Sequence, residues 1–114
     1  MKTAIFLLFF FVGVTHMSAQ NQHLTIKSSD LTFYTLPYSF DAIEPTIDKL
    51  TVEIHYTRHH KAYFDNFLKA IANNDLSNRS LNEIFSNISK YPDVIRNNGG
   101  GYYNHILYWE ILKP

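Results

Sequence analysis

The sequence predicts a small all-α domain, and three segments support this prediction. The stretch from Asp48 to about Asn73 contains neither Gly nor Pro, and its apolar residues recur on one face at helical spacing. Ser80 and Glu83 stand three residues apart in the pattern of a capping box, which marks the start of a second helix. A third helical pattern runs from Tyr102 to Leu112. With 114 residues, the chain is long enough for one domain at most.

The N-terminus has the order of a secretory leader. Lys2 is followed by an apolar run from Ala4 to Val14, and small residues come before Gln20. This order is typical of a signal peptide. The run is too short for a bilayer span, which needs about 20 apolar residues. We therefore expect residues 1–20 to be a cleaved signal peptide, and the mature chain to be periplasmic or secreted without a membrane span. The alternative is a buried core helix.

The next segment is predicted to contain no helix. Residues 21–32 are mostly polar and show no periodic pattern, so we expect a flexible lead-in. The stretch from Phe33 to Pro45 contains Pro37 and Pro45, and each proline biases the residue before it toward an extended conformation. This stretch is therefore predicted to be an extended arm.

The elements after the long helix follow from turn residues and prolines. Residues 73–79 are rich in Asn, Asp and Ser, which predicts a turn. The short helix that starts at Ser80 is predicted to end near Lys90, because Pro92 follows. Residues 97–101 read Asn-Asn-Gly-Gly-Gly, which predicts a loop before the final helix. The glycines lack the Lys and Ser/Thr of a phosphate loop, so we expect them to allow a neighbouring ring to approach the backbone.

Composition narrows the possible functions. Ten basic and ten acidic residues cancel, and no cluster of Lys or Arg occurs, which argues against binding to nucleic acid or to an anionic membrane. The chain has no Cys, so it has no disulfide framework and no thiolate nucleophile. A metal ion would have to be held by His, Asp or Glu. Asn78 and Asn87 fit the N-glycosylation pattern, which matters only if the host glycosylates exported chains.

Histidines on the long helix are the first candidates for chemistry. At 100° per residue, one arc of that helix carries a largely aromatic stripe made up of Val52, His55, Tyr56, His59, Tyr63, Phe67 and Ala70. His55, His59 and Tyr63 are therefore predicted to point inward in successive turns, close enough to share a metal ion or a hydrogen-bond network. The alternative is that they are hydrogen-bonded core or surface residues. His60 lies at the edge of the stripe and fits a structural role better.

The final helix offers a partner for this face. His105 and Trp109 lie four residues apart and so share one side of that helix. If the two helices pack in an antiparallel hairpin, His105 comes close to His55. By itself His105 indicates little.

Five motifs occur in a specific order along the chain. They are Leu36-Pro-Tyr38, Ala42-Ile-Glu-Pro45, the His55-x-x-x-His-His60 helix, Arg96-Asn-Asn-Gly-Gly-Gly101 and Asn104-His-Ile-Leu-Tyr-Trp109. Together they resemble the iron/manganese superoxide dismutases, over the N-terminal half of that family's length. The resemblance implies a long antiparallel helical hairpin preceded by an extended arm, as a domain over residues 33–114. It also implies that the glycine stretch belongs to the start of the final helix.

The resemblance implies a mononuclear site that disproportionates superoxide to oxygen and hydrogen peroxide. It assigns His55 and His105 as ligands of one Mn or Fe ion. It places His59 and Tyr63 in the outer shell and substrate funnel, where they would relay protons to the product through bound water. Trp109 would line the metal cavity.

The residues at the end of the glycine-rich motif bear on the choice of metal. Gly101 matches the manganese-type pattern, because iron-type members tend to have a glutamine there, so the resemblance favours Mn. Tyr102 and Tyr103 stand where manganese-type members often have His and Ala, which would change the polarity of the pocket.

The family's other two ligands belong to an Asp-x-Trp-Glu-His segment in a C-terminal sheet domain, and this sequence lacks that segment. We therefore expect a truncated superoxide dismutase that is inactive as the chain stands, and a homodimer or homotetramer when complete. Without the sheet domain, the hairpin is expected to expose an apolar face that includes Phe64, Tyr108 and Trp109. The alternative function is a non-catalytic helical hairpin that binds a metal weakly or docks a partner.

Overall fold

The computed structural model describes residues 24–112 and 114, and the predicted signal peptide lies outside them. Within the described residues the regular elements are helical, and the only strand-like feature is an isolated bridge between Lys27 and Ser80. The elements are η1 (Ser28–Asp30), α2 (Lys49–Ile54), the π-helical segment η2 (His55–His60), α3 (Lys61–Asn73), α4 (Leu81–Ser86), η3 (Ile88–Lys90) and α5 (Asp93–Ile111). The predicted all-α class is confirmed.

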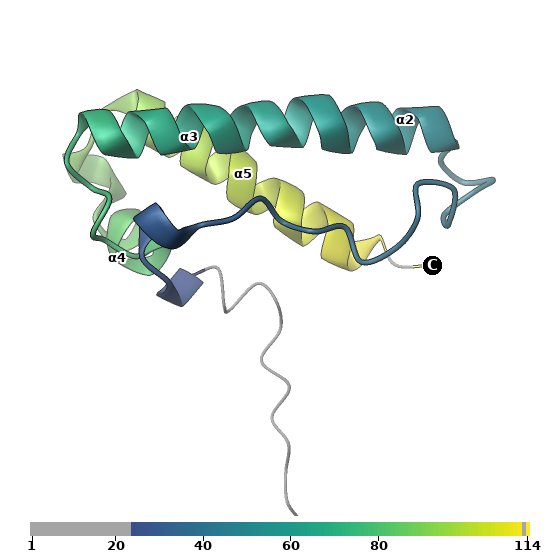
Figure 1. Ribbon diagram of the computed structural model, residues 1–114, viewed down its shortest axis with the longest axis horizontal. Helices are drawn as coiled ribbons and strands as arrows, with labels where there is room; N and C mark the ends of the chain where they lie inside the picture. The colour runs from purple at the N-terminus through teal and green to yellow at the C-terminus, as the bar shows by residue number, and fades with distance from the viewer. Residues whose placement is uncertain (1–23, 113) are drawn as a thin grey trace, which may run out of the picture.

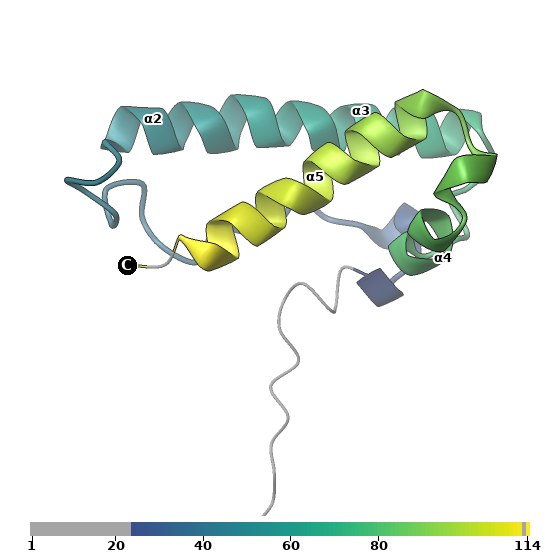
Figure 2. The ribbon, with the colours of Figure 1, turned by 180° about the vertical axis from the view of Figure 1, so that it is seen from behind.

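The long helix and the final helix form the predicted hairpin. α2, η2 and α3 follow one another without a break, and α5 crosses beside them (Figures 1 and 2). His55 contacts His105, and Phe67, which comes later in the first helix, contacts Gly99, which comes earlier in α5. The two helices are therefore antiparallel, and residues far apart in sequence meet along their seam.

Both predicted helix starts are confirmed by their caps. The Asp48 carboxylate accepts a hydrogen bond of 2.9 Å from the backbone N–H of Thr51. Ser80 and Glu83 form a reciprocal capping box at the start of α4. Each cap satisfies backbone donors that a helix start leaves without partners.

The predicted loop at residues 97–101 is wrong, because α5 already begins at Asp93 and runs through the glycines. A Cβ at Gly99 would lie 2.8 Å from a ring carbon of Phe67, and a Cβ at Gly101 would meet the ring of Tyr63. Tight helix packing thus requires glycine at both positions and outweighs its poor helix propensity. The expected close approach between backbone and rings is confirmed.

The arm is extended only over its first part, and the prediction for its second part is wrong. Residues 31–36 lack regular structure, whereas residues 40–46 form successive turns. These turns are closed by backbone hydrogen bonds such as Ala42 N–H to Ser39 O, at 3.1 Å. Proline restricts the conformation of the residue before it. The conformation of the other residues in this segment is set by the short-range hydrogen bonds of the turns.

Aromatic side chains tie the arm to the hairpin, along the side that Figure 1 shows in front of α5. The hydroxyl of Tyr56 donates to the carbonyl of Tyr34 at 2.6 Å, and that of Tyr102 donates to Thr32 at 3.2 Å. Burial raises the pKa of Tyr102, which keeps this phenol protonated as a donor. From the arm, the Tyr38 hydroxyl donates to the carbonyl of Trp109 at 3.1 Å.

The last residues of the segment 21–32 are not flexible as predicted. Ser28 is fully buried, and both its backbone N–H and its hydroxyl donate to the carbonyl of Arg79, at 2.8 and 2.7 Å. These bonds attach the segment before the arm to the turn that precedes α4.

The hydrophobic core lies between the two long helices, the arm and α4. Its members include Val52, Phe64, Phe67, Ile84, Ile95, Tyr102, Ile106 and Trp109. The expectation that Phe64 and Trp109 would be exposed is wrong, because their exposed fractions are 6% and 1%. The arm helps to cover them: the ring centroid of Phe33 lies 5.5 Å from that of Phe64. In the described part of the chain, no helix combines the length and the apolar character needed to cross a membrane.

Candidate metal centre

The structure brings His55 and His105 together across the hairpin seam. His55 is the first residue of η2, and His105 lies in the middle of α5. Their ring centroids are 4.8 Å apart, with the ring planes at 74°. Two imidazoles from facing helices can share one ion at this kind of separation. Their role as ligands stays a prediction, but the required juxtaposition is present.

Both rings are in a form that suits a metal ligand. His105 Nδ1 lies 2.7 Å from the carbonyl oxygen of Gly101, which can only accept, so Nδ1 carries the proton. In the neutral ring this leaves the lone pair on Nε2 for an ion. Burial lowers the pKa of His55, and the nearby rings of His105 and His59 lower it further. Neutral imidazole is therefore favoured at His55, as metal binding requires.

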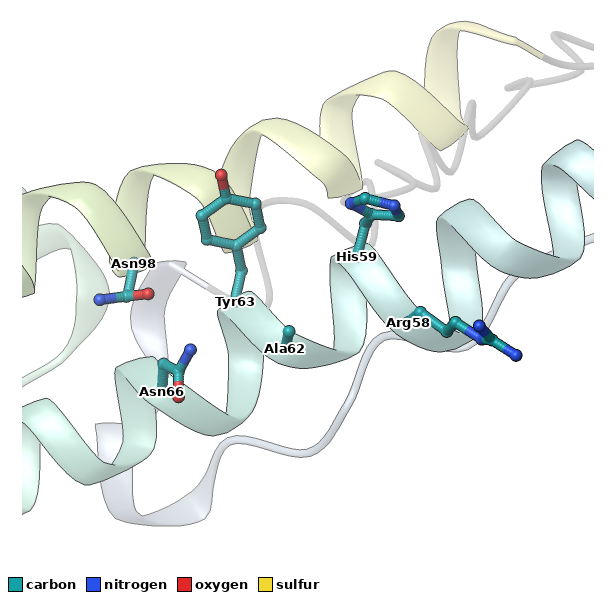
Figure 3. A pocket seen from close by; sticks show the side chains of 6 residues that line it. All are labelled: Arg58, His59, Ala62, Tyr63, Asn66 and Asn98. Atoms are coloured by element: carbon teal, nitrogen blue, oxygen red, sulfur yellow. The ribbon is translucent and has the colours of Figure 1, made fainter.

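His59 and Tyr63 lie on the solvent side of this pair. They line a cavity of about 380 Å³ together with Arg58, Ala62, Asn66 and Asn98. Figure 3 shows both side chains projecting from the same side of their helix, with Arg58 extending away from them. The ring centroid of Tyr63 lies 5.4 Å from that of His105, and the centroid of His59 lies 6.0 Å from that of His55.

The helical wheel misplaces two adjacent histidines. His59, predicted to point inward, is exposed, whereas His60, predicted at the edge, is fully buried. His60 lies four residues before Phe64 and seven before Phe67, which are both buried, so it shares their face of the helix. The predicted stripe was centred on His55 and His59 and left Phe64 at its edge, which placed His59 inward in place of His60. The spacing of His60, Phe64 and Phe67 in the sequence carried the signal for the buried role of His60, which was missed.

Residues 30–113 match a family model described as iron/manganese superoxide dismutases, alpha-hairpin domain. The chain belongs to the iron/manganese superoxide dismutase family. The resemblance carried by the five motifs is thereby confirmed, and the match contains the whole seam from η2 to α5. Iron or manganese is the metal that this family implies.

The described residues bring together two candidate ligands, His55 and His105, and no larger donor cluster. Across residues 24–112 and 114, no cluster of three or more His, Asp or Glu side chains is arranged to hold a metal ion. The donor set of His55 and His105 nevertheless fits a transition metal, because both are imidazoles held on a rigid seam. Trp109, expected to line the cavity, packs against His55 with ring centroids 4.9 Å apart.

Proposed function

We propose that this chain supplies the helical half of the metal site of a superoxide dismutase, which converts two superoxide ions and two protons into oxygen and hydrogen peroxide. The observation that supports this proposal is the meeting of His55 and His105 across the hairpin. These two residues would hold the ion through one ring nitrogen each. When bound, iron or manganese would supply one-electron redox chemistry, which the protein's side chains lack.

The residues that line the cavity could attract a small anion and transfer protons. In the described structure its lining includes Arg58 and no Asp or Glu, so the local charge favours an anion. We propose that superoxide approaches through this cavity. The hydroxyl of Tyr63 and the ring of His59 would pass protons from bulk water to the product, since both groups are exposed and lie beside the ligand pair.

Manganese is the metal that we propose, and Gly101 supports it. A Cβ at this position would meet the ring of Tyr63, so the glutamine that iron-type members tend to have does not fit beside Tyr63 as it stands. The N-terminal leader pattern supports export of the chain. We also propose that the enzyme is a homodimer or homotetramer, as its family implies.

The 114 residues contain no Asp-x-Trp-Glu-His segment, so the proposal assigns only two ligands to them. A direct test fuses the chain to a family sheet domain that carries this segment, loads the protein with manganese and measures superoxide consumption against free metal. We expect activity that is lost in both His55→Ala and His105→Ala fusions. A folded fusion that takes up no metal would refute the proposal.

The second candidate function is a non-catalytic hairpin, and the two-histidine donor set in the described residues favours it. Its expected signature is different. The chain would bind divalent ions weakly through His55 and His105, and the fusion would gain neither tight metal binding nor dismutase activity.

A further inference from the structure

A buried hydrogen bond joins the two helices beside the candidate ligands. The indole Nε1–H of Trp109 donates to Nδ1 of His60 at 3.1 Å. Both residues are almost completely buried, with exposed fractions of 1% and 0%. Indole is a donor only, so Nδ1 of His60 must accept, and the proton of this ring lies on Nε2. The bond therefore fixes both the tautomer and the orientation of His60.

Each member of this bonded pair packs against a different candidate ligand. The ring of His60 stacks on that of His105, with centroids 5.1 Å apart and planes within 12°. The ring of Trp109 packs on that of His55, with centroids 4.9 Å apart and planes at 59°. Rotation of His60 or Trp109 would thus remove the surface against which one ligand ring rests.

Other contacts hold the pair in place from the opposite side. Phe33 of the arm packs on His60 with ring centroids 4.8 Å apart, and Tyr102 stacks on it at 5.4 Å. The carbonyl of Trp109 accepts the hydrogen bond from Tyr38. The pair is therefore enclosed between the arm and the ligands, where side chains have little freedom to change rotamer.

We propose that His60 and Trp109 are positioning residues whose shared hydrogen bond orients His55 and His105 together. The inference rests on the proposed function, in which these two histidines hold the metal. Without the bond, each ligand would keep its place in the chain but lose a fixed ring orientation. Residues that orient metal ligands typically change affinity by about 10- to 100-fold when mutated.

The test uses the full chain and two readouts, one of which needs no metal. Trp109→Phe keeps an aromatic ring against His55 and removes the donor together with part of the indole's packing surface. In the metal-free chain, ¹⁵N NMR of the imidazoles should show a single Nδ1–H tautomer of His105 in the wild type. In Trp109→Phe the His60 ring is free to turn, so the His105 ring that stacks on it can leave the Gly101 carbonyl, and its tautomers should average. Titration with Co²⁺ should show an affinity at least about 10-fold lower in the variant.

A matched control is Tyr56→Phe, which removes a comparable hydrogen bond to the arm at Tyr34 without breaking the pair. It should leave the affinity for Co²⁺ within about 2-fold, on the basis that the ligand rings keep their supports. If Trp109→Phe fails to fold, the comparison moves to His60→Asn, which keeps an acceptor, and His60→Leu, which does not. Both variants remove the ring that stacks on His105, so the comparison isolates the bond to Trp109, which packs on His55. The affinity for Co²⁺ should be higher in the first variant than in the second, and equal affinities would overturn the inference.

The outcomes separate the inference from the proposed function. Fixed tautomers in the wild type and averaged ones in Trp109→Phe support the inference, even if the chain takes up no Co²⁺ and the proposed function fails. Unchanged tautomers and unchanged affinity in Trp109→Phe would overturn the inference and leave the proposed function standing.

Discussion

The ring of Phe67 lies directly on the backbone of Gly99, so that a Cβ at residue 99 would be 2.8 Å from one ring carbon and 3.1 Å from another. Phe85 approaches the same position from α4, at 3.1 Å. Three elements therefore meet at one glycine, and the spacing of the hairpin at its closed end depends on the missing side chain.

Gly99→Ala should destabilise the chain, and Gly100→Ala should not. The extra methyl group at residue 99 forces apart a packed seam, which typically costs about 1–3 kcal/mol. At Gly100 a Cβ meets nothing within 4 Å. Alanine there should stabilise the helix by up to about 1 kcal/mol. Urea unfolding of the two variants measures the difference, and equal shifts would show that the seam does not require glycine.

His55→Ala and His105→Ala should each abolish metal uptake, whereas His59→Ala should retain it. Each of the first two changes removes one of the two candidate ligand rings, whose centroids are 4.8 Å apart. His59 instead lines the cavity outside this pair. The loss in affinity should exceed the roughly 10- to 100-fold that outer residues usually produce. Metal analysis after dialysis against manganese gives the comparison. Full occupancy in His55→Ala would contradict the ligand assignment.

Tyr63→Phe in the fusion to a family sheet domain should leave metal bound and slow turnover, because the phenol lines the cavity beyond the ligand pair. General acid or base groups typically contribute about 10²- to 10⁴-fold to a rate, and bound water can replace part of this effect, so we expect a loss toward the lower end. Gly101→Ala should produce a similar kinetic change with the phenol still present, since its Cβ would displace the Tyr63 ring. Stopped-flow superoxide decay and metal content measure both. Loss of metal in Tyr63→Phe would place this residue closer to the ion than proposed.

The stability of the metal-free chain should fall as pH drops below about 6.5. Burial and neighbouring imidazoles hold the pKa of His55 below its ordinary value of 6.5 in the folded chain. Between the two values the unfolded state binds more protons, so its population rises as pH falls, and the effect is complete below the folded pKa. Urea unfolding at several pH values should show this slope in the wild type and a shallower one in His55→Gln. Equal slopes would mean that His55 is not desolvated.

Local patterns in the sequence were sufficient to predict the helix starts but not the extent of α5. Asp48 and the Ser80–Glu83 capping box act through neighbours in the chain, so short-range rules describe them fully. The helical state of residues 97–101 depends on Phe67 and Tyr63, which are more than thirty positions away in sequence. Propensity contains no information about such partners, and only the family resemblance placed this stretch correctly.

The candidate site divides in the same way. The pairing of His55 with His105 could be anticipated once an antiparallel hairpin was assumed, because both lie on the apolar sides of their helices. The exchange of roles between His59 and His60 was missed because the predicted stripe left out Phe64, although His60 shares one face of the helix with Phe64 and Phe67.

Because of that exchange, two consecutive residues of the helix lie in opposite environments. His59 faces water, and its neighbour in the chain is sealed in the interior. A reagent that modifies accessible imidazoles, such as diethyl pyrocarbonate, should therefore label the first quickly and the second only when the two helices separate. Both residues fall in one peptide, so mass spectrometry can measure the extent of labelling at each. The ratio of labelled His60 to labelled His59 would report how often the two helices separate.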